Sequence, residues 1–197
     1  MRFCPLICAV VFAASLTAGE RMTVSVCIRG DLDEKTIVRA EETAAALFQS
    51  IDIETVWAKC AIGLEGDEAV RQHWFTLRLR DGRPFIPPPP LALDALGEAF
   101  FSEDNVGYIA EVYYQAVQTL AATQSAELPQ LLGYVIAHEL GHLLLGPGHS
   151  PTGVMREAWD RRDLQAIRQG GLSFSPAEGA RMRGVWQGTA PSGGVTR

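Results

Sequence analysis

Apolar residues along this chain recur with two different spacings. Short stretches rich in β-branched and aromatic residues predict strands, and five of them lie at 22–29, 53–60, 74–80, 95–101 and 106–112. The turn from Ser102 to Asn105 separates the last two stretches. That short connection predicts a hairpin, and therefore one antiparallel pair of strands.

Longer stretches place apolar residues three or four positions apart, which is the spacing of a helix with one buried face. Helices are predicted at 31–50, 113–122, 129–145 and from 175 onward. Asp31 or Asp33 can cap the first helix, and Ser175-Pro176-Ala177-Glu178 forms a capping box at the start of the last. A strand, a helix, several strands and then helices is the order of an α/β (α+β) domain with one mixed sheet of about five strands.

Both ends of the chain differ in composition from the rest. Residues 1–19 combine Arg2 with an apolar run and a small-residue end, which predicts a secretory signal peptide. The run is shorter than the ~20 residues that a membrane-spanning helix needs, so we expect no stable membrane insertion after cleavage. Residues 187–197 are rich in Gly, Ser, Pro and Thr and are predicted to be a disordered tail. We therefore expect a secreted or periplasmic protein with a single domain at 20–186.

Charge and cysteine content narrow the function classes. Seventeen basic residues against 23 acidic residues give a net charge of −6, which argues against nucleic acid as a partner. Cys27 and Cys60 remain after signal cleavage, and each ends a predicted strand. In an oxidising compartment this pair is expected to form a disulfide, and two buried free thiols are the alternative.

The predicted helix at 129–145 carries the candidate chemistry. His138 and His142 are four residues apart, so they lie one above the other on one helix face and both imidazoles can reach one ion. Glu139 follows His138 and can hold a water molecule beside that ion and accept its proton. The surrounding helix is otherwise apolar, and a bound cation would remove most of the cost of burying these groups. A hydrogen-bonded His/Glu network in the core is the alternative.

A third histidine follows this helix. Gly146-Pro147-Gly148 must end the helix, because proline cannot continue it and glycine permits a reversed backbone. The chain can then present His149 from a loop as a third ligand. Three protein ligands with one open position are typical of catalytic rather than structural zinc. Met155 lies six residues further on, beyond a second expected turn.

The stretch 138–155 resembles the metzincin clan of zinc endopeptidases, in which His-Glu-x-x-His-x-x-Gly-x-x-His precedes a methionine-containing turn. Within that clan it is most similar to matrixins. The resemblance implies that His138, His142 and His149 bind Zn²⁺, that Glu139 is the general base, and that Met155 forms a floor under the metal. It also implies a zincin-like twisted sheet with an active-site helix, a backing helix and a small C-terminal subdomain.

The activity implied by this resemblance is that of a secreted zinc metalloendopeptidase. It would hydrolyse peptide bonds in peptide or protein substrates with a zinc-bound water that the glutamate activates. The predicted edge strand at 95–101 is the expected surface for an extended peptide, which would add to the sheet as a further strand.

One spacing departs from the metzincin pattern and leaves the third ligand open. Gly146 is four residues after His142 where the family has three, and His149 is seven after it where the family has six. Either the helix runs one residue longer before its glycine turn and His149 is still the ligand, or a downstream carboxylate is the ligand, as in gluzincins. The candidates for that carboxylate are Glu157, Asp160 and Asp163.

A second alternative is a non-catalytic exported binding protein that retains a zincin scaffold. Glu139 argues against it, because a purely structural metal site does not need that carboxylate.

Overall fold

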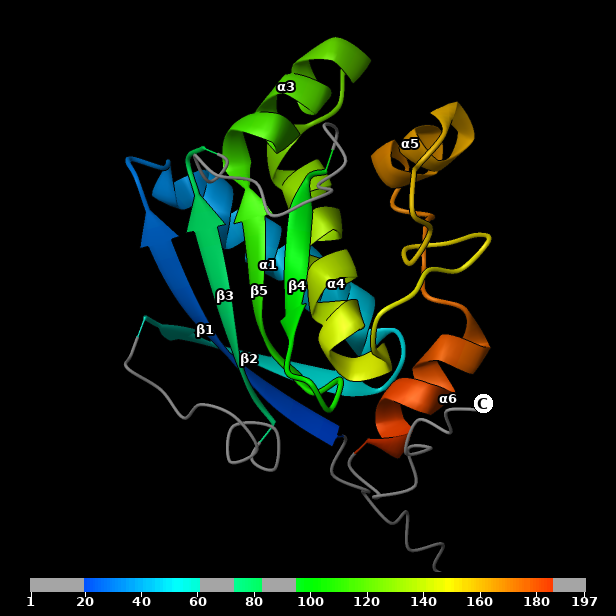
Figure 1. Ribbon diagram of the computed structural model, residues 1–197. Coiled ribbons are helices and arrows are strands. Elements are labelled where there is room, and N and C mark those ends of the chain that lie inside the picture. The colour runs from blue at the N-terminus through cyan, green and yellow to red at the C-terminus, as the bar shows by residue number, and fades with distance from the viewer. Residues whose placement is uncertain (1–19, 61–72, 83–94, 186–197) are drawn as a thin grey trace, which may run out of the picture.

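The computed structural model describes residues 20–60, 73–82 and 95–185. The predicted signal peptide at 1–19 and the predicted tail at 187–197 lie outside these residues. Five strands in the described ranges form one sheet in the order β2-β1-β3-β5-β4 (Figure 1). Their bounds are β1 Glu20–Arg29, β2 Ile53–Lys59, β3 Trp74–Arg80, β4 Gly97–Phe101 and β5 Gly107–Tyr113. β4 runs antiparallel to β5 and the other pairs are parallel, so the predicted mixed sheet with one hairpin is confirmed.

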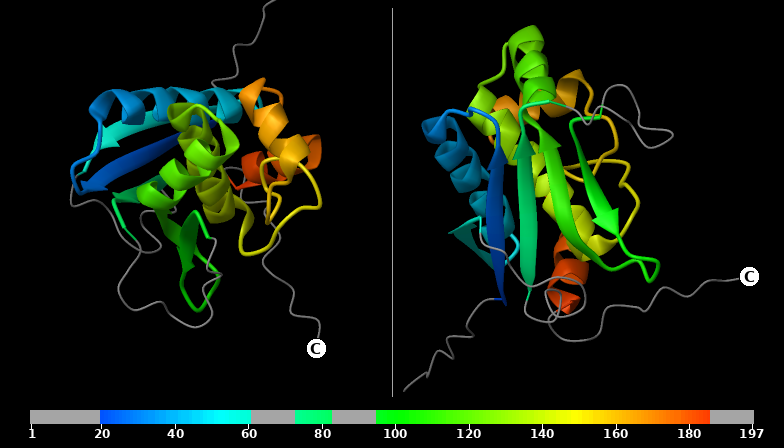
Figure 2. Two further views of the ribbon diagram at one scale, coloured as in Figure 1. Left: turned by 90° about the horizontal axis from the view of Figure 1, so that it is seen from above. Right: turned by 60° about the vertical axis from the view of Figure 1, so that its left-hand side comes forward.

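The helices of the described ranges are α1 Glu34–Gln49, α3 Tyr114–Gln124, α4 Leu128–Leu145, α5 Arg161–Arg168 and α6 Pro176–Gly184. α1 and α4 lie against each other on one face of the sheet, and α5 and α6 lie on the β4 side of the molecule (Figures 1 and 2). The two long helices approach closely at Gly133, where a Cβ would lie 2.6 Å from the backbone oxygen of Ala40. The predicted α/β architecture, with one mixed sheet and two long helices packed together on it, is therefore confirmed.

Alternation along the strands separates a buried face from a charged one. The fully buried side chains toward the helices include Val24, Leu77, Leu79, Ala110 and Val112. Arg78 and Arg80 point to the other face and form ion pairs with Glu111 on β5, at 3.3 and 3.1 Å. The helices therefore cover one face of the sheet. On the other face, the two arginines compensate the charge of the buried Glu111 carboxylate.

The ends of two neighbouring strands are cross-linked. Val26 of β1 and Lys59 of β2 are partners in the parallel register, so Cys27 within β1 and Cys60 directly after β2 come into bridging range. Cys27 and Cys60 form a disulfide there, with their Cα atoms 4.4 Å apart. This confirms the expected pairing over the free-thiol alternative.

α5 is the element that the hydrophobic pattern did not single out. It has eight residues, of which half are charged, with Leu164 and Ile167 as its buried side chains. Asp160 and Asp163 form a capping box at its start, which is the local signal that could have located it. No helix within the described ranges is long and apolar enough to cross a membrane.

Candidate metal centre

α4 brings ionisable side chains into an apolar interior. Its residues from Leu131 to Leu144 are all buried, because the helix packs against α1, β4, β5 and the C-terminal elements. His138, Glu139 and His142 are only 8%, 6% and 7% exposed. His149 follows on an exposed loop after Gly146. Groups of this kind are costly to bury unless they are hydrogen-bonded or bind a cation.

Three imidazoles converge at the end of α4. One ring nitrogen from each of His138, His142 and His149 lies within 4.8 Å of the others. The Nε2 atoms of His138 and His142 face each other at 3.1 Å, and the ring of His149 lies 5.4 and 4.8 Å from these two rings, centroid to centroid. Such a set of converging nitrogen donors fits zinc, for which imidazole is a preferred ligand.

The remaining ring nitrogens orient two of these imidazoles. His138 Nδ1–H donates to the Val154 carbonyl oxygen at 2.7 Å, so the Nε2 lone pair of this tautomer points into the site. His142 Nδ1 makes a longer contact of 3.4 Å with the Gly146 carbonyl oxygen. Burial lowers the pKa of His138 to about 4 and also lowers the pKa of His142. Both rings are therefore neutral at neutral pH, which is the form that binds metals.

The Glu139 side chain of α4 packs against the edge strand β4. A Cβ on Gly97 of β4 would lie 2.7 Å from Glu139 Cγ, so a side chain at position 97 would displace the carboxylate. Burial raises the pKa of Glu139 to about 8, and the nearby Glu98 carboxylate adds to the rise. A divalent cation held by the neighbouring imidazoles would oppose this shift and favour the carboxylate.

Two solved structures share this architecture. The chain superposes on metalloproteinase-II from Bacteroides fragilis with a TM-score of 0.55 and 15% sequence identity, over 87% of this chain and 54% of that one. It superposes on archaemetzincin from Methanopyrus kandleri with a TM-score of 0.52 and 14% identity, over 88% of this chain and 99% of that one. The fold is that of a zincin-like metalloprotease. The chain spans about half the length of the Bacteroides fragilis protein.

Sequence comparison adds nothing to this fold assignment. A scan against models of known protein families gives no match, and neither does a search of curated proteins.

The segment after His149 packs against α4 near the histidine pair. A tight turn with Gly153 at φ +81° places Met155, which is 1% exposed, with its Sδ against the backbone of Gly141. Trp159 packs edge-on against His138 with 5.9 Å between ring centroids. Its Nε1–H donates at 3.3 Å to the same Val154 oxygen that His138 contacts. Sequence reasoning assigned no such role to Trp159.

The acidic candidates for the third ligand are placed differently. The Asp160 carboxylate caps α5, accepting from the backbone N–H groups of Arg162 at 2.7 Å and Asp163 at 3.1 Å. Arg156 pairs with both aspartates. Glu157 is exposed and lines a hollow of about 440 Å³ that His149 also borders. Within the part of the chain that the structure describes, the group able to hold a metal consists of the three histidines.

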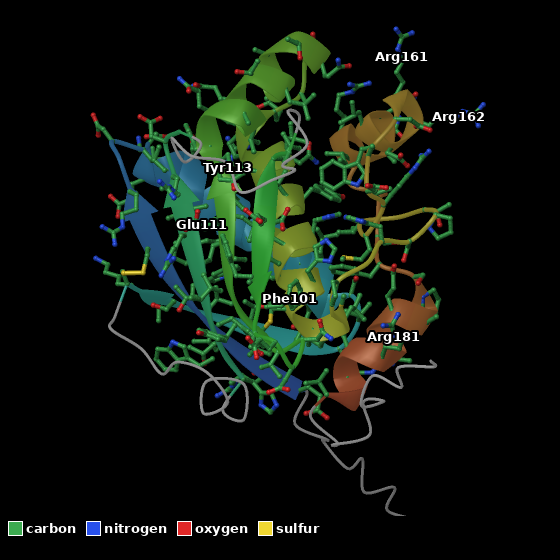
Figure 3. All side chains as sticks on the ribbon, viewed as in Figure 1. Phe101, Glu111, Tyr113, Arg161, Arg162 and Arg181 are labelled. Carbon is green, nitrogen blue, oxygen red and sulfur yellow. A yellow bond between two sulfur atoms is a disulfide. The ribbon has the colours of Figure 1, made fainter. Side chains whose placement is uncertain are left out.

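A second carboxylate and a phenol lie beside Glu139. The Tyr113 hydroxyl donates to Glu98 Oε2 at 3.2 Å, and Figure 3 labels Tyr113 at the end of β5. Burial and the surrounding carboxylates raise the pKa of Tyr113, so its hydroxyl remains a donor. Sequence reasoning did not assign this pair to the site, because the contacts join residues that are far apart in the chain.

The raised pKa of Glu139 predicts a pH dependence for the chelated protein. The folded state keeps a proton on Glu139 up to about pH 8, whereas the unfolded chain loses it near 4.5. Folding stability must therefore fall as pH rises through this window, because the folded state binds more protons. Glu139→Gln removes this contribution. The difference in Tm between the chelated variant and the chelated wild type, taken as variant minus wild type, should therefore increase from pH 5 to pH 8.

Thermal unfolding of both chelated proteins measures this difference directly. His138 and His142 titrate with the opposite sign, since their pKa values are lowered, but both proteins contain them and their effect cancels in the difference. A constant difference in Tm between the two proteins from pH 5 to pH 8 would contradict the raised pKa of Glu139.

Proposed function

We propose that the protein is a zinc-dependent peptidase that hydrolyses peptide bonds in peptide or protein substrates. The convergence of three imidazole nitrogens beside the buried Glu139 carries this proposal. His138, His142 and His149 would hold the ion, and Glu139 would be the general base. The zincin-like fold supports the assignment, since the two solved structures described above are named as a metalloproteinase and an archaemetzincin.

The chemistry divides between the ion and the residues around it. Zinc, when bound, supplies a Lewis acid for the scissile carbonyl and lowers the pKa of the attacking water. Glu139 accepts the proton of that water and passes it to the leaving amine. Packing against Gly97 fixes the Glu139 side chain, and the hydrogen bond to Val154 holds His138 in the tautomer that can ligate.

Within the zincins, we assign the site to the metzincin type with a matrixin-like 138–155 stretch. His149 lies with the other two histidines, while Asp160 is committed to the α5 cap, which supports this choice over a gluzincin arrangement. Met155 would be the methionine of the turn beneath the metal, as its contact with Gly141 supports. β4 is an edge strand, so an extended substrate could pair with it as a further strand.

We also propose that the protein is exported and acts as a secreted or periplasmic enzyme. The apolar run within residues 1–19 supports this location, and so does the Cys27–Cys60 disulfide, because disulfides persist in oxidising compartments.

Chelation tests the proposed function. We expect purified protein to contain about one zinc per chain and to cleave members of a diverse peptide library near neutral pH. Chelation should abolish cleavage and added zinc should restore it, because three imidazoles without an ion provide no Lewis acid. Cleavage that resists complete zinc removal would contradict the proposal. A zinc-loaded protein that cleaves nothing across the library would instead favour the binding protein with a zincin scaffold.

A further inference from the structure

The loop that carries His149 has little support of its own. It consists of Gly146, Pro147, Gly148 and His149, and both glycines have positive φ, +88° and +133°. A Cβ at either glycine would have no heavy atom within 4 Å, so this part of the loop lies in open space. Glycine also adds conformational freedom to a chain. A precise position for the His149 ring therefore depends on how the two ends of the loop are held.

One helix contacts both ends of this loop. At the first end, Arg181 of α6 donates from Nη2 to the backbone oxygen of Leu145, the last residue of α4, at 3.1 Å. At the other end, the hydroxyl of Ser150 donates to the carboxylate of Glu178, also on α6. Residues 178 and 181 are three apart, so they lie on the same side of the helix. Figure 3 labels Arg181 on α6, and Figure 1 shows that helix beside the end of α4.

The carboxylate of Glu178 serves two elements at once. Its Oε2 accepts from the backbone N–H of Ser175 at 2.6 Å, which closes the capping box of α6. Its Oε1 accepts from Ser150, next to His149. Glu178 is 3% exposed, and a buried carboxylate is stable only when its oxygens are hydrogen-bonded in this way. The start of α6 and the end of the loop therefore share one buried group.

α6 is itself fixed to the body of the domain. Met182 is fully buried in the core, and Gly179 packs against Ile51 after α1. Arg183 donates to the backbone oxygen of Ile51 at 2.7 Å. The helix can therefore act as a rigid support for the loop.

We propose that α6 is the positioning element of the metal centre, with Glu178 and Arg181 holding the two ends of the loop and thereby setting the place of His149. This inference rests on the proposed ligand role of His149. Ser150, Glu178 and Arg181 are positioning residues and not ligands. The extra residue between His142 and His149 falls before Gly146, in the last turn of α4, and the step from Gly146 to His149 keeps the family's three residues.

Zinc affinity and the visible spectrum of the cobalt-substituted protein test this proposal. Ser150→Ala should weaken zinc binding by about 10–100-fold, as is typical when a group that orients a ligand is removed. It should also change the cobalt spectrum toward that of His149→Ala, because the third nitrogen leaves the ion for part of the time. Ser150→Thr keeps the hydroxyl and should restore both properties. Affinity is measured by competition with a chromophoric chelator.

Ser175→Ala is the matched control. It removes the other serine hydroxyl that contacts Glu178, at the backbone N–H, and leaves the Ser150 contact in place. Loss of a helix cap should lower the Tm by roughly 2–4 °C. Zinc affinity and the cobalt spectrum should stay as in wild type.

The outcomes separate this inference from the proposed function. If His149→Ala weakens zinc binding but Ser150→Ala does not, the positioning role is wrong and the ligand set stands. If His149→Ala binds zinc like wild type, the ligand set and the positioning role both fail. An equal loss of zinc affinity in Ser150→Ala and Ser175→Ala would mean that α6 affects the site only through the stability of the fold, which also overturns the proposal.

A second variant covers the case in which Ser150→Ala does not fold. Arg181→Met removes the donor to Leu145 and keeps an unbranched side chain at this exposed position. It should weaken zinc binding several-fold and alter the cobalt spectrum in the same direction. Wild-type affinity in folded Arg181→Met would overturn the role of that end of the loop.

Discussion

Glu139→Gln should lower peptide hydrolysis by at least about 10²–10⁴-fold, the effect typical of removing a general base, while the protein keeps its zinc and its fold. Glutamine has nearly the shape of glutamate, so it can occupy the same space against Gly97. Its amide cannot accept the proton of the attacking water. Zinc should remain, because the proposed ligands are the three histidines and not this carboxylate.

The measurement compares wild type and Glu139→Gln on one peptide library, with the zinc content of both proteins determined in parallel. Glu103→Gln is a control for charge removal, since Glu103 is an exposed carboxylate in the turn between β4 and β5. It should cleave like wild type. Equal turnover by Glu139→Gln and wild type, at equal zinc content, would remove Glu139 from its proposed role.

Local patterns predicted most of the individual elements. The strand predicted at 74–80 has those bounds in the structure as β3, because strict alternation places Phe75, Leu77 and Leu79 on the buried face. Asp33, one of two predicted caps, accepts from the Thr36 backbone N–H at 2.9 Å. The order of the strands was not predictable in the same way. Pairing of β3 with β5 and of β1 with β2 depends on tertiary packing, which no local pattern records.

The same distinction explains what was found of the site. His138, Glu139 and His142 lie on one helix, so their spacing alone places them together. His149 stayed open because its position depends on a loop rather than on a helical period. Gly97 was missed because its importance comes from a contact with Glu139 on another element.

Glu178 makes one hydrogen bond that a local motif predicts and one that it does not. The capping box from Ser175 to Glu178 was predicted and is confirmed, because it joins residues three apart. The second hydrogen bond of the same carboxylate reaches Ser150, on the far side of α5 in the sequence. A capping box provides hydrogen-bond partners for the first backbone N–H groups of a helix whether or not its glutamate also contacts another segment. The four residues of the motif therefore do not indicate a connection to the metal centre.

Zinc binding should be abolished by His138→Ala or His142→Ala, strongly weakened by His149→Ala, and unchanged by Glu157→Ala. The first two imidazoles project from a rigid buried helix, with Nε2 atoms 3.1 Å apart, so neither can be replaced by a neighbouring group. His149 completes the set from its loop. Asp160 is held by Arg156 and by the α5 cap, and its release to a metal would cost those hydrogen bonds.

Metal analysis of the purified variants and chelator competition measure this series. Asp160→Ala is an informative companion, because loss of the α5 cap should reduce thermal stability without changing zinc affinity. Reduced affinity in Glu157→Ala or Asp160→Ala, with wild-type affinity in His149→Ala, would show that a carboxylate is the third ligand. The site would then be of the gluzincin type, and the chain's resemblance to matrixins would be confined to His138, Glu139 and His142. Full zinc occupancy in His138→Ala or His142→Ala would reject the site itself, because these two residues supply the pair of nitrogens on which both ligand sets depend.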